Sequence, residues 1–309
     1  MGAQTLGTGV TVLTANLARR QRSALRLALQ QYLRNRAALA GFVALGLLVL
    51  CSVLAGNLAP YDPIRVSLSD KLQPPNGIHW FGTDYFGRDL LSRALYGGQV
   101  SLSVGLLVVL IAGGVGVPIG LAAGYLGGRI DNVLMRLMDA CLTFPPLLLA
   151  VAIVGSLGPD IQNVMLALGI VNIPIFSRLV RSSTLAAREE LYVEAARALG
   201  ATPLRIVAVH ILRNVVAPIM VQMTVTFSGA LIAEASLSFL GLGAQPPTPS
   251  WGRDLNEARR YLEDAPWLLA APTGLIMVAV LSVNFIGDGL RDALDPRSWR
   301  DHGKAAKPS

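Results

Sequence analysis

Long runs of apolar residues alternate with short polar segments along most of this chain. Six of these runs reach about 20 residues, the length that a helix needs to cross the hydrocarbon layer of a membrane. They comprise residues 38–58, 100–125, 133–157, 161–180, 215–242 and 266–285. The pattern therefore predicts an all-α integral membrane protein with six transmembrane helices.

The composition supports this prediction and excludes an ordinary soluble domain. Hydrophobic residues make up 53% of the 309 residues, charged residues only 15%, and the mean hydropathy is positive. A single soluble core of this size could not bury so much apolar surface.

The distribution of arginine predicts the orientation in the membrane. Six arginines and no acidic residue precede the first apolar run: Arg19, Arg20, Arg22, Arg26, Arg34 and Arg36. The positive-inside rule then places the N-terminus in the cytoplasm, and six spans return the C-terminus to the same side. The expected organisation is a cytoplasmic tail (1–37), a transmembrane domain (38–291) and a second cytoplasmic tail (292–309). Within the domain we expect an extracytoplasmic loop at 60–98 and a cytoplasmic insert at 181–214.

The insert contains a helix-forming segment that is suited to docking against a partner. Ala195 and Ala196 are small, so their helix can lie deep in a groove, while Glu194 and Arg197 offer charges one turn apart. Gly200 predicts the end of this helix. Thr202 followed by Pro203 predicts the cap and first turn of a second short helix, so that the insert forms a bent helical pair.

The same insert resembles the cytoplasmic coupling loop of ABC importer permeases. The resemblance rests on Glu-Ala-Ala, on a Gly four residues after the second Ala, and on an Ile-x-Leu-like element further on; Arg213 stands where that family usually has Pro. The residues that it identifies as coupling residues are Tyr192, Glu194, Ala195, Ala196, Leu199, Gly200, Ile211 and Leu212.

Three further segments are similar to the C-type permeases of dipeptide and oligopeptide importers. The first is an extracytoplasmic motif made of Gly82, Thr83, Asp84, Gly87, Arg88 and Asp89. The others are residues 234–252 and 284–297, and together the matches span roughly residues 32–300 in the family's order. Four ordered matches are much more specific than the Glu-Ala-Ala motif alone.

The resemblance implies the type I ABC importer permease fold and a function in which this chain forms half of a translocation pathway for short peptides. It also implies a second homologous permease, two cytoplasmic ABC ATPase domains that bind ATP and Mg, and an extracytoplasmic solute-binding protein. The expected location is a prokaryotic plasma (inner) membrane, in contact with lipid. Alternative cargoes are nickel chelates, glutathione or antimicrobial peptides. Outside this class, the chain could be a non-transporting membrane scaffold or a secondary transporter.

We find no sequence signal for catalysis or for a cofactor bound by this chain. None of the three lysines follows the glycine spacing of a phosphate-binding loop, and no nucleophile motif is present. The three histidines are scattered without ligand spacing, so no metal site is expected. The basic residues cluster at helix ends on one predicted face, which favours membrane orientation over nucleic-acid binding.

Two carboxylates at membrane depth are candidates for the translocation pathway or a gate, because burying a charge there is costly. The alternative is a satisfied interhelical bond. For Asp139 we favour the bond, since Arg136 lies one turn away; for Glu234 both interpretations stay open.

Small residues and prolines are expected to shape the spans. Gly116, Gly120 and Gly124 share one helix face, where another helix of this chain or of a second permease can approach closely. Pro145 and Pro146 are expected to kink or break the third span. In the loop 60–98, Asp and Thr residues can cap a short helix that ends near Tyr96, and this loop could lie on the membrane or meet a substrate-delivering protein.

Overall fold

A computed structural model describes residues 29–294 of the chain, all of them in helices and the segments that connect helices. The α-helices are α2 (Arg36–Val53), α3 (Ala55–Leu58), α4 (Leu90–Leu126), α5 (Gly128–Leu142), α6 (Pro146–Leu157), α7 (Ile161–Arg188), α8 (Leu191–Ala198), α9 (Pro203–Arg205), α10 (Leu212–Phe239), α11 (Trp251–Ala258) and α12 (Trp267–Leu294). Residues 29–34 are also helical, and the structure further contains two 3₁₀ turns, η1 (Leu68–Asp70) and η3 (Arg259–Tyr261), and one π-helix, η2 (Ile206–Ile211). The arginines at 19–26 and most of both predicted tails lie outside the described residues.

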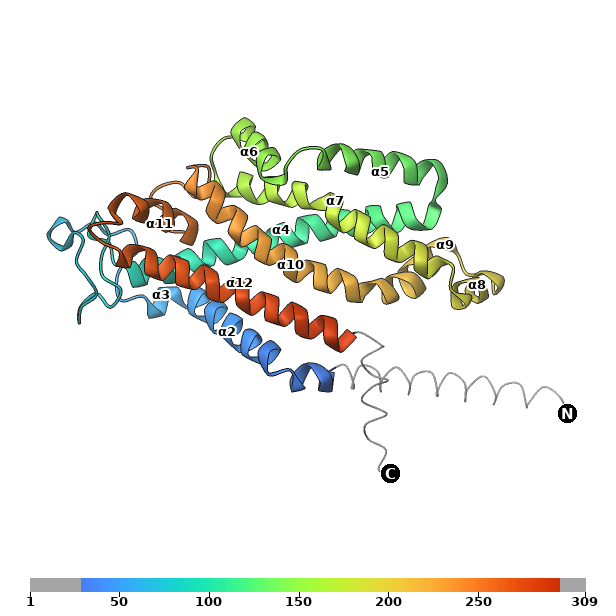
Figure 1. Ribbon diagram of the computed structural model, residues 1–309, viewed down its shortest axis with the longest axis horizontal. Coiled ribbons are helices and arrows are strands. Elements are labelled where there is room, and N and C mark those ends of the chain that lie inside the picture. The colour runs from blue at the N-terminus through green and yellow to red at the C-terminus, as the bar shows by residue number, and fades with distance from the viewer. Residues whose placement is uncertain (1–28, 295–309) are drawn as a thin grey trace, which may run out of the picture.

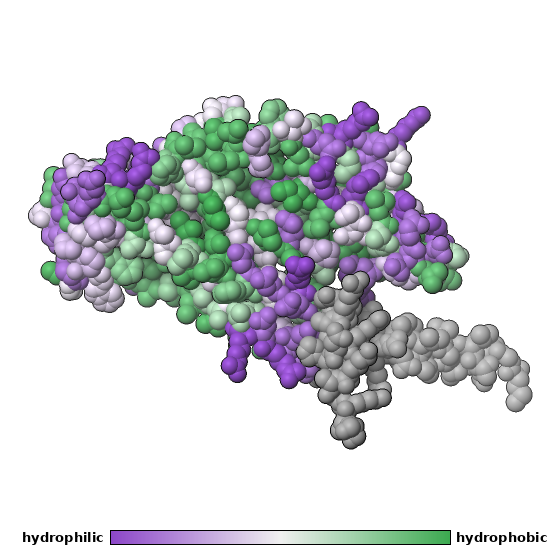
Figure 2. All heavy atoms as spheres, viewed as in Figure 1, coloured by the Kyte–Doolittle hydropathy of each residue, from purple (hydrophilic) through white to green (hydrophobic). Residues whose placement is uncertain are grey.

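Five helices are long and apolar enough to cross a membrane, and a bent helix pair can supply a sixth span. The five are Arg36–Val53, Leu90–Leu126, Ile161–Arg188, Pro203–Phe239 and Trp267–Leu294. Figure 2 shows a broad apolar band over the middle of the molecule, with hydrophilic residues gathered toward its ends. The prediction of an all-α protein with six spans is confirmed, with one span broken.

The third predicted span is not one continuous helix. It consists of α5 and α6, which meet at an angle of 86° across residues 143–145. Pro145 adopts an extended conformation (φ −54°, ψ 130°), and Pro146 begins α6 at a position where its missing N–H costs nothing. A proline pair thus ends one helix and starts the next.

Two other spans begin earlier than the apolar pattern predicts. Helix α4 starts at Leu90, because the Asp89 side chain caps it by accepting from the Ser92 backbone N–H at 2.8 Å. The short helix that we expected to end near Tyr96 is therefore the beginning of α4. Hydropathy did not indicate these first turns of α4, because they contain polar residues that pack against the loops of the chain.

The fifth span is likewise longer than predicted, because the helix runs without interruption from Pro203 through η2 and α10 to Phe239. The second half of the insert is thus an extension of a transmembrane helix. Arg213, unlike the Pro usual in the family, retains its backbone N–H and lies within the first turn of α10.

Helices α4 and α7 pack through the three glycines predicted to allow close approach. A Cβ at Gly120 would lie 2.6 Å from the Ser177 carbonyl oxygen, and one at Gly124 would lie 2.7 Å from the Thr184 Cβ. Gly116 meets Phe176 in the same way, at 2.6 Å. The close packing is therefore made within this chain, and we call this contact the glycine seam.

The two ends of the bundle are built from different elements. Residues 59–89 and 240–266 gather at one end, the left end in Figure 1, which we call the cap end. Helices α8 and α9 lie at the opposite end, which we call the insert end, and α2 runs beside α12 along one side of the bundle. The long helices α4, α7 and α10 run between these ends, so they are the elements that can connect them.

The glycine seam predicts which glycines tolerate a side chain. Gly120→Val places methyl groups where the α7 backbone lies, so we expect a loss of about 1–3 kcal/mol from overpacking. Gly114→Val on the same helix is the matched control, because nothing lies within 4 Å of its Cβ position. Thermal unfolding of the detergent-solubilised protein measures both. Equal melting temperatures for the two variants would contradict the packing described.

Candidate functional site

The first half of the insert is a short helix fastened to the start of the fifth span. Val193 and Ala196 of α8 are buried against Ile206 and Ile211 of the π-helix η2. The Tyr192 hydroxyl accepts a hydrogen bond from the Asn214 side-chain amide at 2.6 Å. Two of the predicted coupling residues, Ala196 and Ile211, therefore lie inside the insert and hold it together.

The turn between the two parts of the insert has the predicted chemistry. Gly200 adopts φ +78° and its N–H donates to the Arg197 carbonyl at 3.0 Å, which ends α8 as a left-handed cap. The Thr202 hydroxyl accepts from the Arg205 backbone N–H, and Pro203 occupies the first helical position. The predicted cap and first turn are confirmed, but the second helix is not short, because it continues from Pro203 through η2 into α10.

The outer surface of the insert presents large apolar side chains to the solvent. The relative exposures of Leu191, Leu199 and Leu204 are 81%, 88% and 79%. Glu194 and Ala195 are exposed on the same short helix, whereas Leu212 is half-buried at the start of α10. Unpaired leucines beside charges at the tip of a protrusion are typical of a protein-binding surface.

The predicted extracytoplasmic motif forms a compact brace at the cap end. The Asp84 carboxylate accepts from the backbone N–H groups of Phe86 and Arg88, at 2.8 and 2.9 Å. Gly82 and Gly87 have positive φ, and a Cβ at Gly87 would lie 1.7 Å from the Ser67 carbonyl oxygen. The glycines are therefore required by backbone conformation and close approach.

The side chains of the same motif continue into the start of α4. Thr83 pairs with Asp89 through an isolated antiparallel bridge, and the Thr83 hydroxyl donates to the Asp70 carbonyl. One Asp89 carboxylate oxygen, Oδ1, contacts His79 Nδ1 at 2.9 Å, while the other, Oδ2, caps α4 by accepting from the Ser92 backbone N–H. All six predicted motif residues thus lie in one structural unit, which fixes the start of α4.

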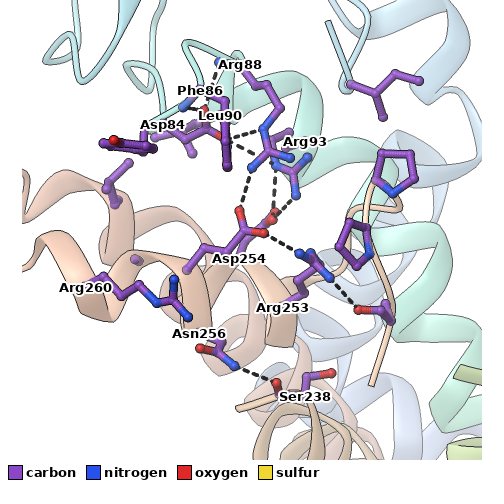
Figure 3. Close-up of a pocket in the computed structure, with 18 of the residues that line it drawn as sticks. Asp84, Phe86, Arg88, Leu90, Arg93, Ser238, Arg253, Asp254, Asn256 and Arg260 are labelled. Atoms are coloured by element: carbon purple, nitrogen blue, oxygen red, sulfur yellow. Dashed lines mark hydrogen bonds and ion pairs between the residues drawn. The ribbon is translucent and has the colours of Figure 1, made fainter. Parts of the chain in front are cut away.

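Arginines of this unit reach across to α11 and tie the two halves of the cap together. The Arg93 guanidinium donates to the Asp254 carboxylate, with its Nε at 3.0 Å, and both side chains are more than nine-tenths buried. Arg88 bridges Asp84 and Glu257, each at 2.5 Å (Figure 3). The sequence does not indicate that Arg93, Asp254 and Glu257 form a group, because no local pattern links Arg93 to residues so far along the chain.

The charge network also controls the ionisation of Glu257. Burial alone would raise the pKa of Glu257, but Arg88 and Arg93, together with a hydrogen bond from Arg253, lower it below the ordinary value. This carboxylate is therefore ionised at neutral pH and contributes to the network as an anion.

Glu234 lies at the point where α4, α10 and the start of α11 meet. Its side chain is 1% exposed and accepts hydrogen bonds from the hydroxyls of Ser238, Ser250 and Ser101, at 2.8, 3.3 and 3.4 Å. Ser250 is also the N-cap of α11. The carboxylate thus joins two transmembrane helices to the cap, which is compatible with both a gating and a packing role.

Asp139 forms an interhelical ion pair, but with a different partner from the one expected. Arg178 of α7 donates to it at 2.7 Å, in place of Arg136 on its own helix. Both side chains are more than half exposed. The bond joins the broken span to α7.

No group of three or more potential metal-ligating side chains occurs within residues 29–294.

The buried ion pair between Arg93 and Asp254 gives a prediction about the stability of the cap end. Arg93→Met leaves the buried Asp254 carboxylate unpaired, which is expected to cost about 3–5 kcal/mol. Adding Asp254→Leu removes the orphaned charge and is expected to restore part of that loss. Denaturant unfolding of both variants measures this, with the exposed Arg65→Met as the control. An Arg93→Met variant that is as stable as the unsubstituted protein would contradict the pairing of Arg93 with Asp254.

Comparison with known proteins identifies the family. The family model described as binding-protein-dependent transport system inner membrane component matches residues 116–300, and that of the N-terminal TM domain of oligopeptide transport permease C matches residues 23–75. A chain of the inward-facing MetNI methionine ABC transporter shares the fold, with a TM-score of 0.56 and 19% identity over 67% of this chain and 98% of that chain.

Curated relatives match over nearly their whole length. A dipeptide transport system permease protein of Alkalihalophilus pseudofirmus is 46% identical over 88% of this chain and 90% of its own. A di/tripeptide transport system permease protein of Pseudomonas aeruginosa is 44% identical over 87% and 90%, and a glutathione transport system permease protein of Escherichia coli is 44% identical over 87% and 89%. The chain is therefore an integral membrane protein and a transport component that belongs to the family of inner membrane components of binding-protein-dependent transport systems.

Proposed function

We propose that this chain is the permease subunit of an ATP-driven importer and forms half of a translocation pathway for short peptides. The observation that carries this proposal is the exposed apolar tip of the insert, built on a helix that is continuous with the fifth span. The names of the relatives above support peptides as the cargo. Glutathione is a second candidate, because the glutathione transport system permease protein named above is 44% identical to this chain.

The proposed orientation places the insert end in the cytoplasm. Basic residues at the insert end include Arg129, Arg181, Arg188, Arg197 and Arg205, as the positive-inside rule requires of a cytoplasmic face. The cap end then faces a substrate-delivering protein outside the membrane. This orientation is compatible with the expected N-terminal and C-terminal cytoplasmic tails.

The energy is proposed to come from two partner ATPase domains, which bind ATP and Mg and contact the insert. A second, homologous permease completes the pathway, and a solute-binding protein delivers the cargo. This chain itself supplies a two-state element whose equilibrium the nucleotide biases. A scaffold that only tethers a partner would lack this dependence on nucleotide, so the ATPase rate distinguishes the two functions.

The described contacts suggest how displacement of the insert reaches the opposite end. Helix α8 packs on η2, which continues into α10, and α10 carries Glu234. Glu234 in turn bonds to Ser101 on α4 and to Ser250 at the start of α11. A pull on the insert therefore acts on the cap through packed helices and one buried carboxylate.

The docking role predicts the effect of changing the exposed tip. Leu199→Glu and Glu194→Ala alter only side chains that are exposed on this chain, so its own fold is expected to be unchanged. We expect the stimulation of ATPase activity by peptide-loaded binding protein to fall about tenfold or more, because anchor residues dominate interfaces. The purified complex in lipid measures this, with the exposed cap variant Glu263→Ala as the control. Full stimulation of the ATPase activity in both insert variants would show that the insert only tethers the ATPase.

Glu234 gives a separate prediction about transport. Glu234→Gln keeps the size of the side chain but replaces one hydrogen-bond acceptor by a donor and removes the charge. We expect peptide uptake into proteoliposomes to be impaired while the yield of assembled complex is unchanged. Normal uptake by this variant would show that the carboxylate has only a packing role.

A further inference from the structure

A cavity of about 550 Å³ lies at the cap end, between the start of α4, the loop that precedes α11, and α11 itself. Figure 3 shows its charged side chains, with Arg88 and Arg93 facing Asp254 across the space between these elements. The volume lies within the range of about 300–1,000 Å³ that is usual for small-molecule sites. It is therefore suited to a small ligand.

The charges that line the cavity do not cancel. Four arginines line it (Arg88, Arg93, Arg253 and Arg260), together with three carboxylates (Asp84, Asp254 and Glu257). The three carboxylates pair with the first three arginines. Arg260 makes no ion pair within the described part of the chain, so the cavity has one positive charge in excess. Such an excess in a recess attracts an anion.

A second donor in the cavity wall is also without a partner. Arg253 donates through Nη1 to the Ala244 carbonyl at 2.9 Å and through Nη2 to Glu257 at 2.6 Å. Its Nε–H is buried and has no acceptor among the described residues. A buried donor without an acceptor is costly, and a ligand oxygen could satisfy it.

Part of the cavity wall consists of exposed apolar side chains, and we call this part the mouth. Ile64, Val66 and Phe86 line it with relative exposures of 45%, 56% and 43%. The Tyr85 ring, also partly exposed, stacks on Tyr261 with 4.6 Å between centroids. Exposed aromatic and aliphatic side chains next to unpaired cationic donors suit a ligand with an anionic end and an apolar body.

We propose that this cavity binds the C-terminal carboxylate of a short peptide, with Arg260 and the Nε–H of Arg253 as its donors and the apolar mouth against a peptide side chain. The proposal rests on the proposed transport function and adds a cargo subsite at the extracytoplasmic side. Arg88, Arg93 and their carboxylate partners form the fixed floor of the site and are not themselves ligands.

The test compares a peptide acid with its amide. The complete transporter is reconstituted in lipid nanodiscs without the binding protein, and the binding of radiolabelled Ala-Phe and of Ala-Phe amide is measured by equilibrium dialysis. We expect the acid to bind about tenfold more tightly, because charge-assisted hydrogen bonds to the carboxylate are lost in the amide. Arg260→Gln is expected to abolish that preference, while Arg259→Gln, at the adjacent exposed position outside the cavity, retains it.

Each outcome of this test decides the proposal. Equal binding of acid and amide, or a preference that survives Arg260→Gln, would overturn it. A second arm measures docking of the empty binding protein; if Arg260→Gln weakens this docking and leaves the peptide preference unchanged, the carboxylate belongs to that protein and the proposal fails. ATP-driven uptake by the same preparation tests the proposed function separately, since uptake without the acid preference refutes only the subsite.

Discussion

The close packing of α4 against α7 at the glycine seam holds the centre of the bundle together. Because Gly116, Gly120 and Gly124 have no side chains, the two backbones approach within contact distance over several turns. The driving force in a membrane is packing and not the exclusion of water, so this shape match is what holds the pair together. Both helices extend beyond the seam, and their ends carry the elements that we assign to function.

The seam makes α4 a rigid connection between distant parts of the chain. Its first turns hold Arg93 and Ser101, which bind the cap through Asp254 and Glu234. Helix α7 leads directly into the insert, which packs in turn on the extension of α10. Three long helices thus join the insert to the cap, and the buried polar contacts lie where these helices meet. A transporter whose two ends open alternately needs this kind of mechanical continuity.

Local sequence chemistry predicted much of this arrangement, whereas long-range partners could not be predicted. The turn at Gly200, the cap at Thr202 and the glycine seam follow from backbone rules that act within a few residues. The pairing of Arg93 with Asp254 joins residues 161 positions apart, and a single sequence contains no signal for it. In the sequence, Arg93 and Asp254 each appear only as a charged residue near a predicted transmembrane segment, with nothing to indicate that they pair.

The errors have a common physical origin in the use of hydropathy to place helix ends. The start of α4 mixes apolar residues with Ser92 and Arg93, and the extension before α10 is interrupted by Arg205 and His210, so placing helix ends by hydropathy shortens both helices. The break at Pro145 was expected as a kink or a break, but not its angle, which depends on how α6 packs against α7. Asp139 was assigned to Arg136 because sequence shows only neighbours on the same helix, whereas Arg178 comes from the next span.

We propose that the insert is the surface through which an ATPase acts on this chain. The most direct measurement is site-specific photo-crosslinking in the assembled transporter, with the crosslinker at Leu199 and a control at the membrane-facing position Leu106, whose side chain is 53% exposed. We expect a crosslink from position 199 to the ATPase subunit and none from position 106. Crosslinks from position 199 that reach only lipid or this chain itself would contradict it.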